Sequence, residues 1–213
     1  MNLNWIVFEA GDGAGKSTQV DMLANFYREK KKIEPLVCKQ PGNTKLGNTL
    51  RTILLSDGYD GFICPEAERL LFAADNSQFI EEIIKPAKND NDIIIQDRYT
   101  PYSNFVYGYY GNQIKDKKFF DLIEVATKGY YPDLVFILDL DTQEAINRMN
   151  NRGKLAKTRI DNMNFDFHQR VRDGYLKLAE DDDKFKIIDA SKNKDLIHEE
   201  IVQIIAGVES ELK

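Results

Sequence analysis

Short apolar runs alternate along the chain with longer stretches in which apolar residues recur three and four positions apart. The short runs are rich in β-branched residues and have no polar face, as in Ile93, Ile94 and Ile95, which is typical of strands covered on both sides. Strands are predicted at 5–9, 35–39, 92–97, 134–139 and 185–189. Their alternation with helices predicts an α/β protein with a five-stranded parallel sheet and three α/β/α layers.

The longer stretches predict helices at 15–30, 46–55, 65–84, 117–127, 142–149, 164–179 and 195–209. Pro65 suits the first turn of the third helix, and Pro86 is expected to end it. The segment from Asn150 to Thr158 has no clear period and is expected to be a mobile loop. Since no linker, repeat or low-complexity tract divides the chain, we expect one domain over residues 1–213.

The composition is typical of one cytosolic globular domain. The chain has 213 residues, of which 42% are apolar, and can bury a core without disulfides. Its two cysteines, Cys38 and Cys64, have no CxxC pattern and are expected to be reduced thiols. No apolar run exceeds five residues and the amino end lacks a signal-peptide pattern, so we expect a cytoplasmic protein without membrane contact.

The net charge of −6 disfavours a nucleic-acid partner, so phosphate is expected to bind at a local site. Residues 10–18 (Ala-Gly-Asp-Gly-Ala-Gly-Lys-Ser-Thr) match the Walker A pattern A/G-x4-G-K-S/T between the first strand and the first helix. Backbone N–H groups of such a loop surround a polyphosphate, Lys16 would reach its terminal phosphates and Ser17 would bind Mg2+. The pattern predicts a P-loop NTPase fold, but leaves open kinase, GTPase, transport ATPase or nonenzymatic switch.

A second constellation favours a kinase of small nucleotides. Asp97, Arg98 and Tyr99 follow the third predicted strand, at the sheet edge where ligands bind in open α/β folds. The Asp97 carboxylate would support Mg2+ or the acceptor, while Arg98 would bind an acceptor phosphate. A structural ion pair is the alternative interpretation. A GTPase is disfavoured because the sequence has no base-reading N/TKxD motif after a later strand.

Five blocks in order resemble the thymidylate kinase family, which transfers the γ-phosphate of ATP to dTMP. Residues 8–19 (FEAGDGAGKSTQ) are similar to F-E-G-x-D-G-A-G-K-S-T-Q of the family, and residues 39–44 (KQPGNT) to R-E-P-G-G-T. Residues 70–75 (LLFAAD) and 97–99 (DRY) match family blocks, and residues 159–161 (RID) with the helix after them resemble its lid. The resemblance implies ATP, dTMP and Mg2+ as ligands, a lid at about 150–160 and a homodimer.

The resemblance also implies individual roles. Asp12 would accept a hydrogen bond from the 3′-hydroxyl, Phe72 would stack on the base, and Tyr107 would crowd the 2′ position, although plain packing is the alternative for Tyr107. The implied monophosphate site comprises Asp12, Lys39, Arg51, Phe72, Asn76, Arg98, Ser103, Asn104 and Tyr107. The implied ATP site comprises Gly11, Asp12, Gly13, Ala14, Gly15, Lys16, Ser17, Thr18 and Arg148, with Ser17 and Asp97 at the metal. The implied catalytic residues are Lys16, Asp97, Arg98, Arg152 and Arg159.

The catalytic arginine of the family comes from the phosphate loop or from the lid. Gly13 follows Asp12 here in place of a basic residue, so the lid is expected to supply the charge through Arg152 and Arg159. For Arg148, a surface position on a helix is as plausible as a nucleotide contact.

Three positions depart from the family pattern. Asn76 stands where the family usually has an arginine aimed at a thymine carbonyl, and its amide could read thymine or another base edge. Lys39 and Gln40 replace Arg-Glu, and the chain is one residue longer between Tyr99 and Ser103. A related kinase acting on dGMP or dUMP, or a nonenzymatic nucleotide switch, therefore remains the alternative to dTMP phosphorylation.

Overall fold

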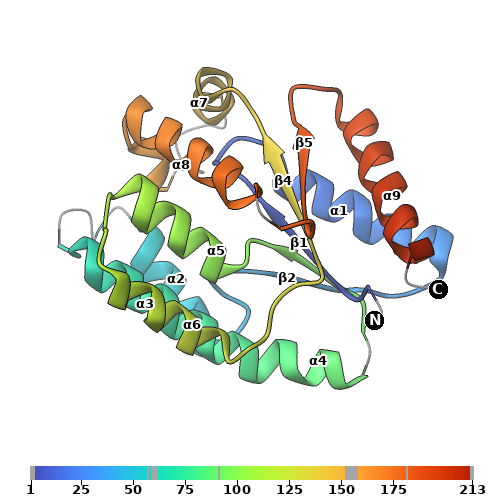
Figure 1. The fold of residues 1–213 in the computed structure, drawn as a ribbon, viewed down its shortest axis with the longest axis horizontal. Coiled ribbons are helices and arrows are strands. Elements are labelled where there is room, and N and C mark those ends of the chain that lie inside the picture. Colours follow the sequence, from blue (N-terminus) through green and yellow to red (C-terminus); the bar gives the residue numbers. More distant parts are fainter. Residues whose placement is uncertain are drawn as a thin grey trace.

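The computed structural model describes residues 3–56, 58, 62–90, 92–151, 158–180 and 182–211 (Figure 1). Within these residues, one sheet contains β1 (Trp5–Glu9), β2 (Leu36–Lys39), β3 (Ile94–Asp97), β4 (Leu134–Asp139) and β5 (Phe185–Asp189). All neighbouring strands are parallel and their order is β2-β3-β1-β4-β5. The predicted five-stranded parallel sheet is confirmed, with boundaries shifted by at most two residues.

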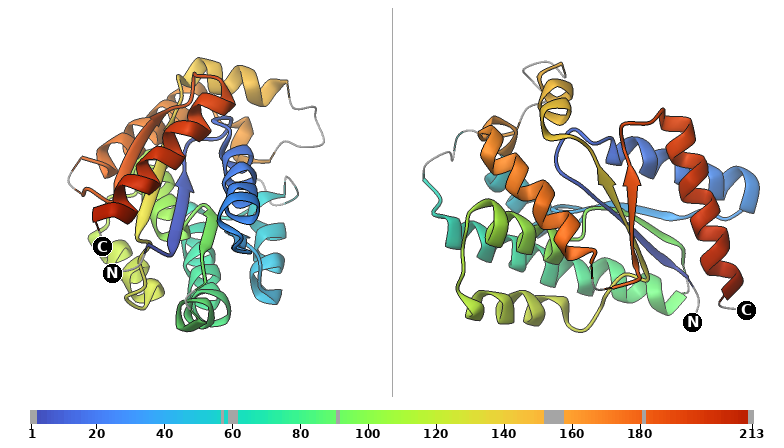
Figure 2. Two further views of the ribbon diagram at one scale, coloured as in Figure 1. Left: turned by 90° about the vertical axis from the view of Figure 1, so that its right-hand side faces the viewer. Right: turned by 45° about the horizontal axis from the view of Figure 1, so that its top comes forward.

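The helices cover both faces of this sheet. They are α1 (Lys16–Phe26), α2 (Lys45–Leu55), α3 (Pro65–Phe79), α4 (Lys85–Asp90), α5 (Thr100–Phe105), α6 (Lys117–Thr127), α7 (Thr142–Asn150), α8 (Phe165–Leu178) and α9 (Lys194–Glu211). Helices α1 and α9 lie on one face, and α3, α5 and α8 lie on the other (Figures 1 and 2). Within the described residues, no helix combines the length and the hydropathy needed to cross a membrane.

Strand β1 holds the two cores together because its side chains alternate between them. Ile6 and Phe8 pack with α1 and α9, whereas Trp5 and Val7 pack with the helices of the opposite face. All five residues of β1 are buried, which explains why the strand lacks a polar face. Phe8 pairs with Asp97 of β3, so the ends of β1 and β3 lie side by side at the carboxyl edge of the sheet. This register places residues 10–18 next to Arg98.

One helix prediction was wrong, and one helix was missed. Pro86 does not end the third helix: the chain passes from α3 through a π-helical turn (Ile80–Ile84) into α4. The N–H of Lys85 bonds to Ile80 O, so the missing N–H of Pro86 falls where π-helical bonding returns to α-helical bonding. Helix α5 and its π-helical turn (Val106–Gly111) were not predicted, because α5 is buried on nearly all sides and shows no amphipathic period.

Candidate active site

The phosphate loop between β1 and α1 depends on two glycines. Gly13 and Gly15 have φ of 90° and 91°, a region that residues with a Cβ rarely adopt. A Cβ on Gly13 would also lie 2.6 Å from the carbonyl oxygen of Ala145 in α7. The loop therefore has no room for a side chain at position 13. Gly15 is the N-cap of α1, and the positive end of that helix lies beside the loop.

A cavity of about 300 Å³ opens beside this loop. Its walls come from the loop, the ends of β2 and β3, helices α2, α3 and α5, and the segment before α8. They comprise Asp12, Gly13, Gly15, Lys16, Ser17, Thr18, Lys39, Gln40, Pro41, Arg51, Leu55, Arg69, Phe72, Asp97, Arg98, Thr100, Ser103, Asn104, Tyr107, Thr158, Ile160 and Asp161. Most residues of both predicted nucleotide sites thus line the same cavity.

The remaining predicted residues lie elsewhere. Gly11 and Ala14 face a second, small cavity of about 20 Å³ behind the loop, which Asp12 also lines. Asn76, Arg148 and Arg159 are absent from the described residues that line the large cavity. Arg152 lies outside the described residues.

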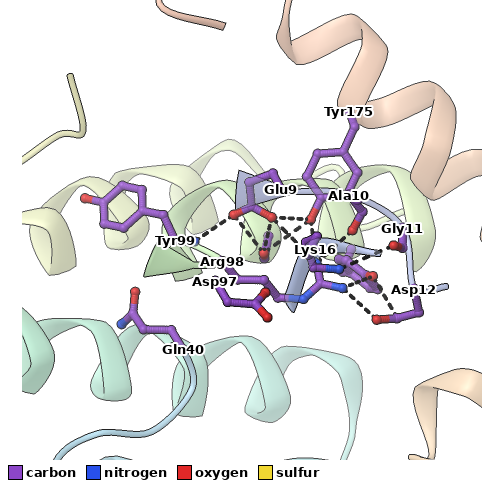
Figure 3. A network of polar contacts seen from close by, with 12 residues as sticks. Glu9, Ala10, Gly11, Asp12, Lys16, Gln40, Asp97, Arg98, Tyr99 and Tyr175 are labelled. Atoms are coloured by element: carbon purple, nitrogen blue, oxygen red, sulfur yellow. Dashed lines mark hydrogen bonds and ion pairs between the residues drawn. The ribbon is translucent and has the colours of Figure 1, made fainter. Parts of the chain in front are cut away.

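Arg98 is the centre of the polar network at the end of β1 (Figure 3). Its Nη1 donates to Ala10 O at 2.9 Å and to Tyr175 Oη at 3.0 Å, while Nη2 donates to Asp12 Oδ1 at 2.6 Å. The backbone of Arg98 has φ of 67°, which is uncommon for a residue with a side chain. Such a conformation persists only where the surroundings over-determine it, as these contacts do.

Asp12 is held ionised by this network. Burial opposes its charge, but Arg98, Lys16 and a hydrogen bond from Tyr107 outweigh burial and lower the pKa of Asp12 to about 2. The Tyr107 hydroxyl donates to Asp12 Oδ2 at 3.0 Å. Arg98, Asp12 and Tyr107 are therefore fixed relative to one another before any ligand binds.

Glu9 is a site residue that the sequence analysis did not single out. Its side chain is fully buried and accepts hydrogen bonds from Tyr99 N at 2.8 Å, Tyr175 Oη at 2.8 Å and Ser103 Oγ at 2.9 Å. Arg98 Nη1 lies 3.6 Å from Glu9 Oε2, and burial raises the pKa of Glu9. The available signal was an acidic residue directly after the apolar run of β1.

Ser17 and Asp97 form a pair of oxygen ligands beside Lys16. The Ser17 hydroxyl donates to Asp97 Oδ2 at 2.7 Å, and both residues line the cavity. Hydroxyl and carboxylate oxygens suit a divalent cation such as Mg2+, which usually keeps waters and substrate phosphates as its other ligands. The described residues contain no cluster of three or more acidic, His or Cys side chains arranged for a metal. Burial lowers the pKa of Lys16, and the charge of Arg98 adds to this effect.

The opposite wall of the cavity carries Arg51, Phe72 and Arg69. Arg51 Nη1 donates to Pro41 O at 2.8 Å, which holds its guanidinium at the cavity. The Arg69 guanidinium carbon lies 4.7 Å from the ring centroid of Phe72. Arg69 was not predicted as a site residue; the available signal was its position one helical turn before Phe72.

The amide of Asn76 is used within the protein. Its Nδ2 donates to Ala126 O at 2.7 Å, and its Oδ1 accepts from Gln40 Nε2 at 3.2 Å. The side chain is fully buried behind the cavity wall. Among the described residues, Asn76 is thus not part of the lining of the large cavity, and both ends of its amide are hydrogen-bonded within the protein.

The two described lid-side arginines, Arg148 and Arg159, make contacts away from the large cavity. Arg159 contacts the Glu68 carboxylate of α3, and its Nη2 donates to Leu54 O at 3.3 Å. Arg148 contacts Glu144 and donates to Ala190 O at 3.2 Å. Neither guanidinium lies among the cavity groups, although Thr158, Ile160 and Asp161 around Arg159 line the cavity.

The family model, the related sequences and the solved structure that match this chain all carry the same description. The sequence model of a family described as Thymidylate kinase matches residues 8–201. A thymidylate kinase of Fervidobacterium nodosum is 36% identical over 200 residues, covering 94% of this chain and 97% of the relative. A probable thymidylate kinase of Thermococcus kodakarensis is 37% identical over 206 residues, covering 94% of this chain and 96% of the relative. The crystal structure of thymidylate kinase from Ehrlichia chaffeensis superposes with a TM-score of 0.74 at 26% identity, covering 95% of this chain and 98% of that one.

Proposed function

The chain belongs to the thymidylate kinase family, and from this premise we propose that it is an ATP:dTMP phosphotransferase that produces dTDP. One observation carries the proposal: the phosphate loop and the arginines at positions 51 and 98 line the same cavity. A protein that binds only a triphosphate needs no arginines beyond its phosphate loop. A kinase that also binds a monophosphate needs further cations for the acceptor phosphate, and Arg51 and Arg98 can supply them.

The reaction is an in-line transfer. A phosphate oxygen of dTMP attacks the γ-phosphorus of ATP, a new P–O bond forms, and the bond to the β-phosphate oxygen breaks to release ADP. Lys16 binds the transferring end of ATP, while Arg51, Arg98 and Lys39 hold the acceptor phosphate. These cations offset charge on the transferring group, and Arg51 and Arg98 are already held by hydrogen bonds to Pro41 and Asp12, which limits their reorganisation during the step.

The sugar and base of dTMP occupy the α3–α5 side of the cavity. Asp12 accepts a hydrogen bond from the 3′-hydroxyl, for which its low pKa keeps it ionised. Tyr107 excludes a 2′-hydroxyl, Phe72 stacks on the base, and Ser103 and Asn104 lie along the base. All of these residues line the cavity.

Mg2+ is the divalent metal we propose, and Ser17 and Asp97 are the residues that would hold it. When bound, it would offset negative charge on the triphosphate. Asp97 also lines the cavity and would help to orient the acceptor phosphate.

The lid supplies the remaining positive charge. Gly13 leaves no space for a basic side chain in the phosphate loop, so an arginine must reach the reaction from residues 150–160. Arg152 and Arg159 are the candidates, and Arg148 contacts ATP on the lid side. Arg159 has to leave Glu68 to act, which makes its contribution dependent on closure. Such an arginine accelerates related phosphoryl transfers by about 10³–10⁵.

The remaining features follow from the family. We propose one kinase domain over residues 1–213, acting as a cytoplasmic homodimer without nucleic-acid or membrane partners. Light scattering at micromolar concentration tests the dimer directly.

A substrate panel tests the function. The protein is incubated with ATP, Mg2+ and either dTMP, dUMP, dGMP, dCMP or dAMP, and the diphosphate product is separated by chromatography. We expect dTMP to be among the best substrates, with dUMP weaker by about 10–200-fold at most, because one methyl group discriminates only weakly. Failure of dTMP to be phosphorylated, or ATP binding in a calorimeter without monophosphate binding, would contradict the proposal.

A further inference from the structure

The buried polar groups of the cavity wall are mostly committed to one another. Gln40 Nε2 donates to Asp75 and Asn76, and Gln40 Oε1 accepts from Gln96 Nε2 at 2.9 Å and from Thr100 N at 3.1 Å. The hydroxyl of Ser103 bonds to Glu9, and that of Thr100 to Asp75. None of these groups is available to a base without breaking an existing bond.

Arg69 and Asn104 are different. Each is 1% exposed, and both line the cavity. Asn104 Nδ2 donates to Arg69 O at 3.0 Å, which fixes the orientation of the amide and leaves Oδ1 as a buried acceptor with no hydrogen-bond partner among the described residues. In the described part of the protein, Arg69 Nε is likewise a buried donor without a partner. A buried polar atom left unpaired costs about 1–3 kcal/mol, so both atoms favour a ligand that pairs them.

The guanidinium of Arg69 is held in place from two sides. Glu68 contacts its Nη2, and the ring of Phe72 lies against its plane. It thus lies next to the aromatic ring on which the base stacks under the proposed function. Arg69 also precedes Asn76 by seven residues, two turns of α3, so both positions lie on one side of the helix.

Arg69 offers a guanidinium on α3 where position 76, which is usually an arginine in the family, is an asparagine. Asn76 is buried outside the cavity lining with both ends of its amide hydrogen-bonded within the protein, whereas Arg69 lines the cavity and lies on the same side of α3. We propose that Arg69 determines base specificity by donating a hydrogen bond to the C4 carbonyl oxygen of thymine, while Asn104 Oδ1 accepts a hydrogen bond from the neighbouring N3–H. The inference rests on the proposed function, because it names how that site reads the base.

The pairing predicts which bases are accepted. Thymine and uracil present an N–H donor beside a carbonyl acceptor, which complements Asn104 Oδ1 and Arg69. Cytosine presents the reverse order, a ring nitrogen acceptor beside an amino donor, and would leave both protein atoms unpaired. Guanine presents the same N–H and carbonyl pair as thymine on a larger ring.

The test measures kcat/KM for dTMP and dCMP in wild type, Arg69→Met, Asn104→Leu and the comparison variant Asn76→Leu. Met and Leu approximate the replaced side chains in size but form no hydrogen bonds at these positions. We expect each of the first two variants to lower the dTMP:dCMP ratio at least tenfold, since unpaired polar groups drive such selectivity. Arg69→Lys should recover part of the ratio. Asn76→Leu should lower the melting temperature and leave the ratio within about threefold of wild type.

Other readouts separate specificity from folding. KM for ATP and the melting temperature report structural damage, which would depress activity on both monophosphates together and leave their ratio unchanged. An unchanged ratio in Arg69→Met and Asn104→Leu, or a ratio that collapses only in Asn76→Leu, overturns the inference even if dTMP is the substrate. If wild type instead prefers dGMP over dTMP, the proposed function fails, and the same variants, measured with dGMP against dAMP, then test the base-reading pair by itself.

Discussion

Arg98 Nη2 and Asp12 Oδ1 lie 2.6 Å apart, joining the end of β3 to the phosphate loop. Replacement of Arg98 by Met removes this ion pair and the cation nearest to the buried Glu9. We expect kcat/KM for dTMP to fall by about 10³, since an acceptor-phosphate cation is lost. Unfolding free energy should fall by about 3 kcal/mol, the scale for breaking a buried pair. Steady-state kinetics and urea unfolding measure the two effects; turnover within threefold of wild type would contradict the assigned role.

Gly13 is the tightest point of the phosphate loop. A Gly13→Ala change places a Cβ 2.6 Å from Ala145 O at a φ of +90°. We expect a loss of more than about 1 kcal/mol in stability and a large loss of ATP affinity. Gly207→Ala, in α9 with no atom within 4 Å of the added Cβ, is the matched control and should stabilise the protein by up to about 1 kcal/mol. Equal melting temperatures for the two variants would show that the loop tolerates a side chain.

The lid arginines should act on the chemical step more than on binding. Arg159→Ala and Arg152→Ala are compared by rapid-quench measurement of the phosphoryl-transfer rate. The arginine that reaches the transition state should slow this rate by about 10³ or more while KM for dTMP changes little. Arg28→Ala serves as control, because Arg28 pairs with Glu34 on the surface. If neither lid variant changes the rate, the missing charge comes from another source.

Tyr107 should control the choice between deoxyribose and ribose. Its ring is buried against Phe167 and Tyr175, so it should stay in place even without the hydroxyl bond to Asp12. Tyr107→Ala is expected to raise the relative kcat/KM for the ribose analogue of dTMP by about tenfold or more, whereas Tyr107→Phe should keep most of the discrimination. Competition assays with the two sugars measure this; no difference between the variants would assign Tyr107 to packing.

Asp75 gives the stability a defined pH dependence. Burial raises its pKa from 3.8 to about 6, against hydrogen bonds from Gly42, Gln40 and Thr100. Between these values the folded protein keeps a proton that the unfolded chain has released, so this group's contribution to stability falls as pH rises from about 4 to about 6. The full loss is about 3 kcal/mol. Asp75→Asn lacks this titration, and urea unfolding at several pH values should show a difference between the two proteins that changes across this window and is flat above it.

Much of the fold could be predicted because its signals are local. The apolar runs of β1, β3 and β4 and the glycine-rich residues 10–18 are recognisable within ten residues of sequence, and the parallel sheet follows from their order. Helix α5 could not be predicted in this way, since burial on nearly all sides erases the amphipathic period. Pro86 was misjudged because a π-helical turn, which no composition signal marks, absorbed its missing N–H.

The candidate site likewise contains features that the sequence predicts and features that only the structure shows. The sequence by itself determined the phosphate loop, the Asp97 and Arg98 pair and the likeness to one kinase family, because these depend on residue types at fixed spacing. Only the tertiary structure decided that the Asn76 amide is hydrogen-bonded to Ala126 and Gln40 and that Arg69 lines the cavity. It also decided that Glu9 lies next to Arg98. Which polar atoms remain unpaired depends on neighbours 35 to 50 residues away, and chain folding alone brings those neighbours together.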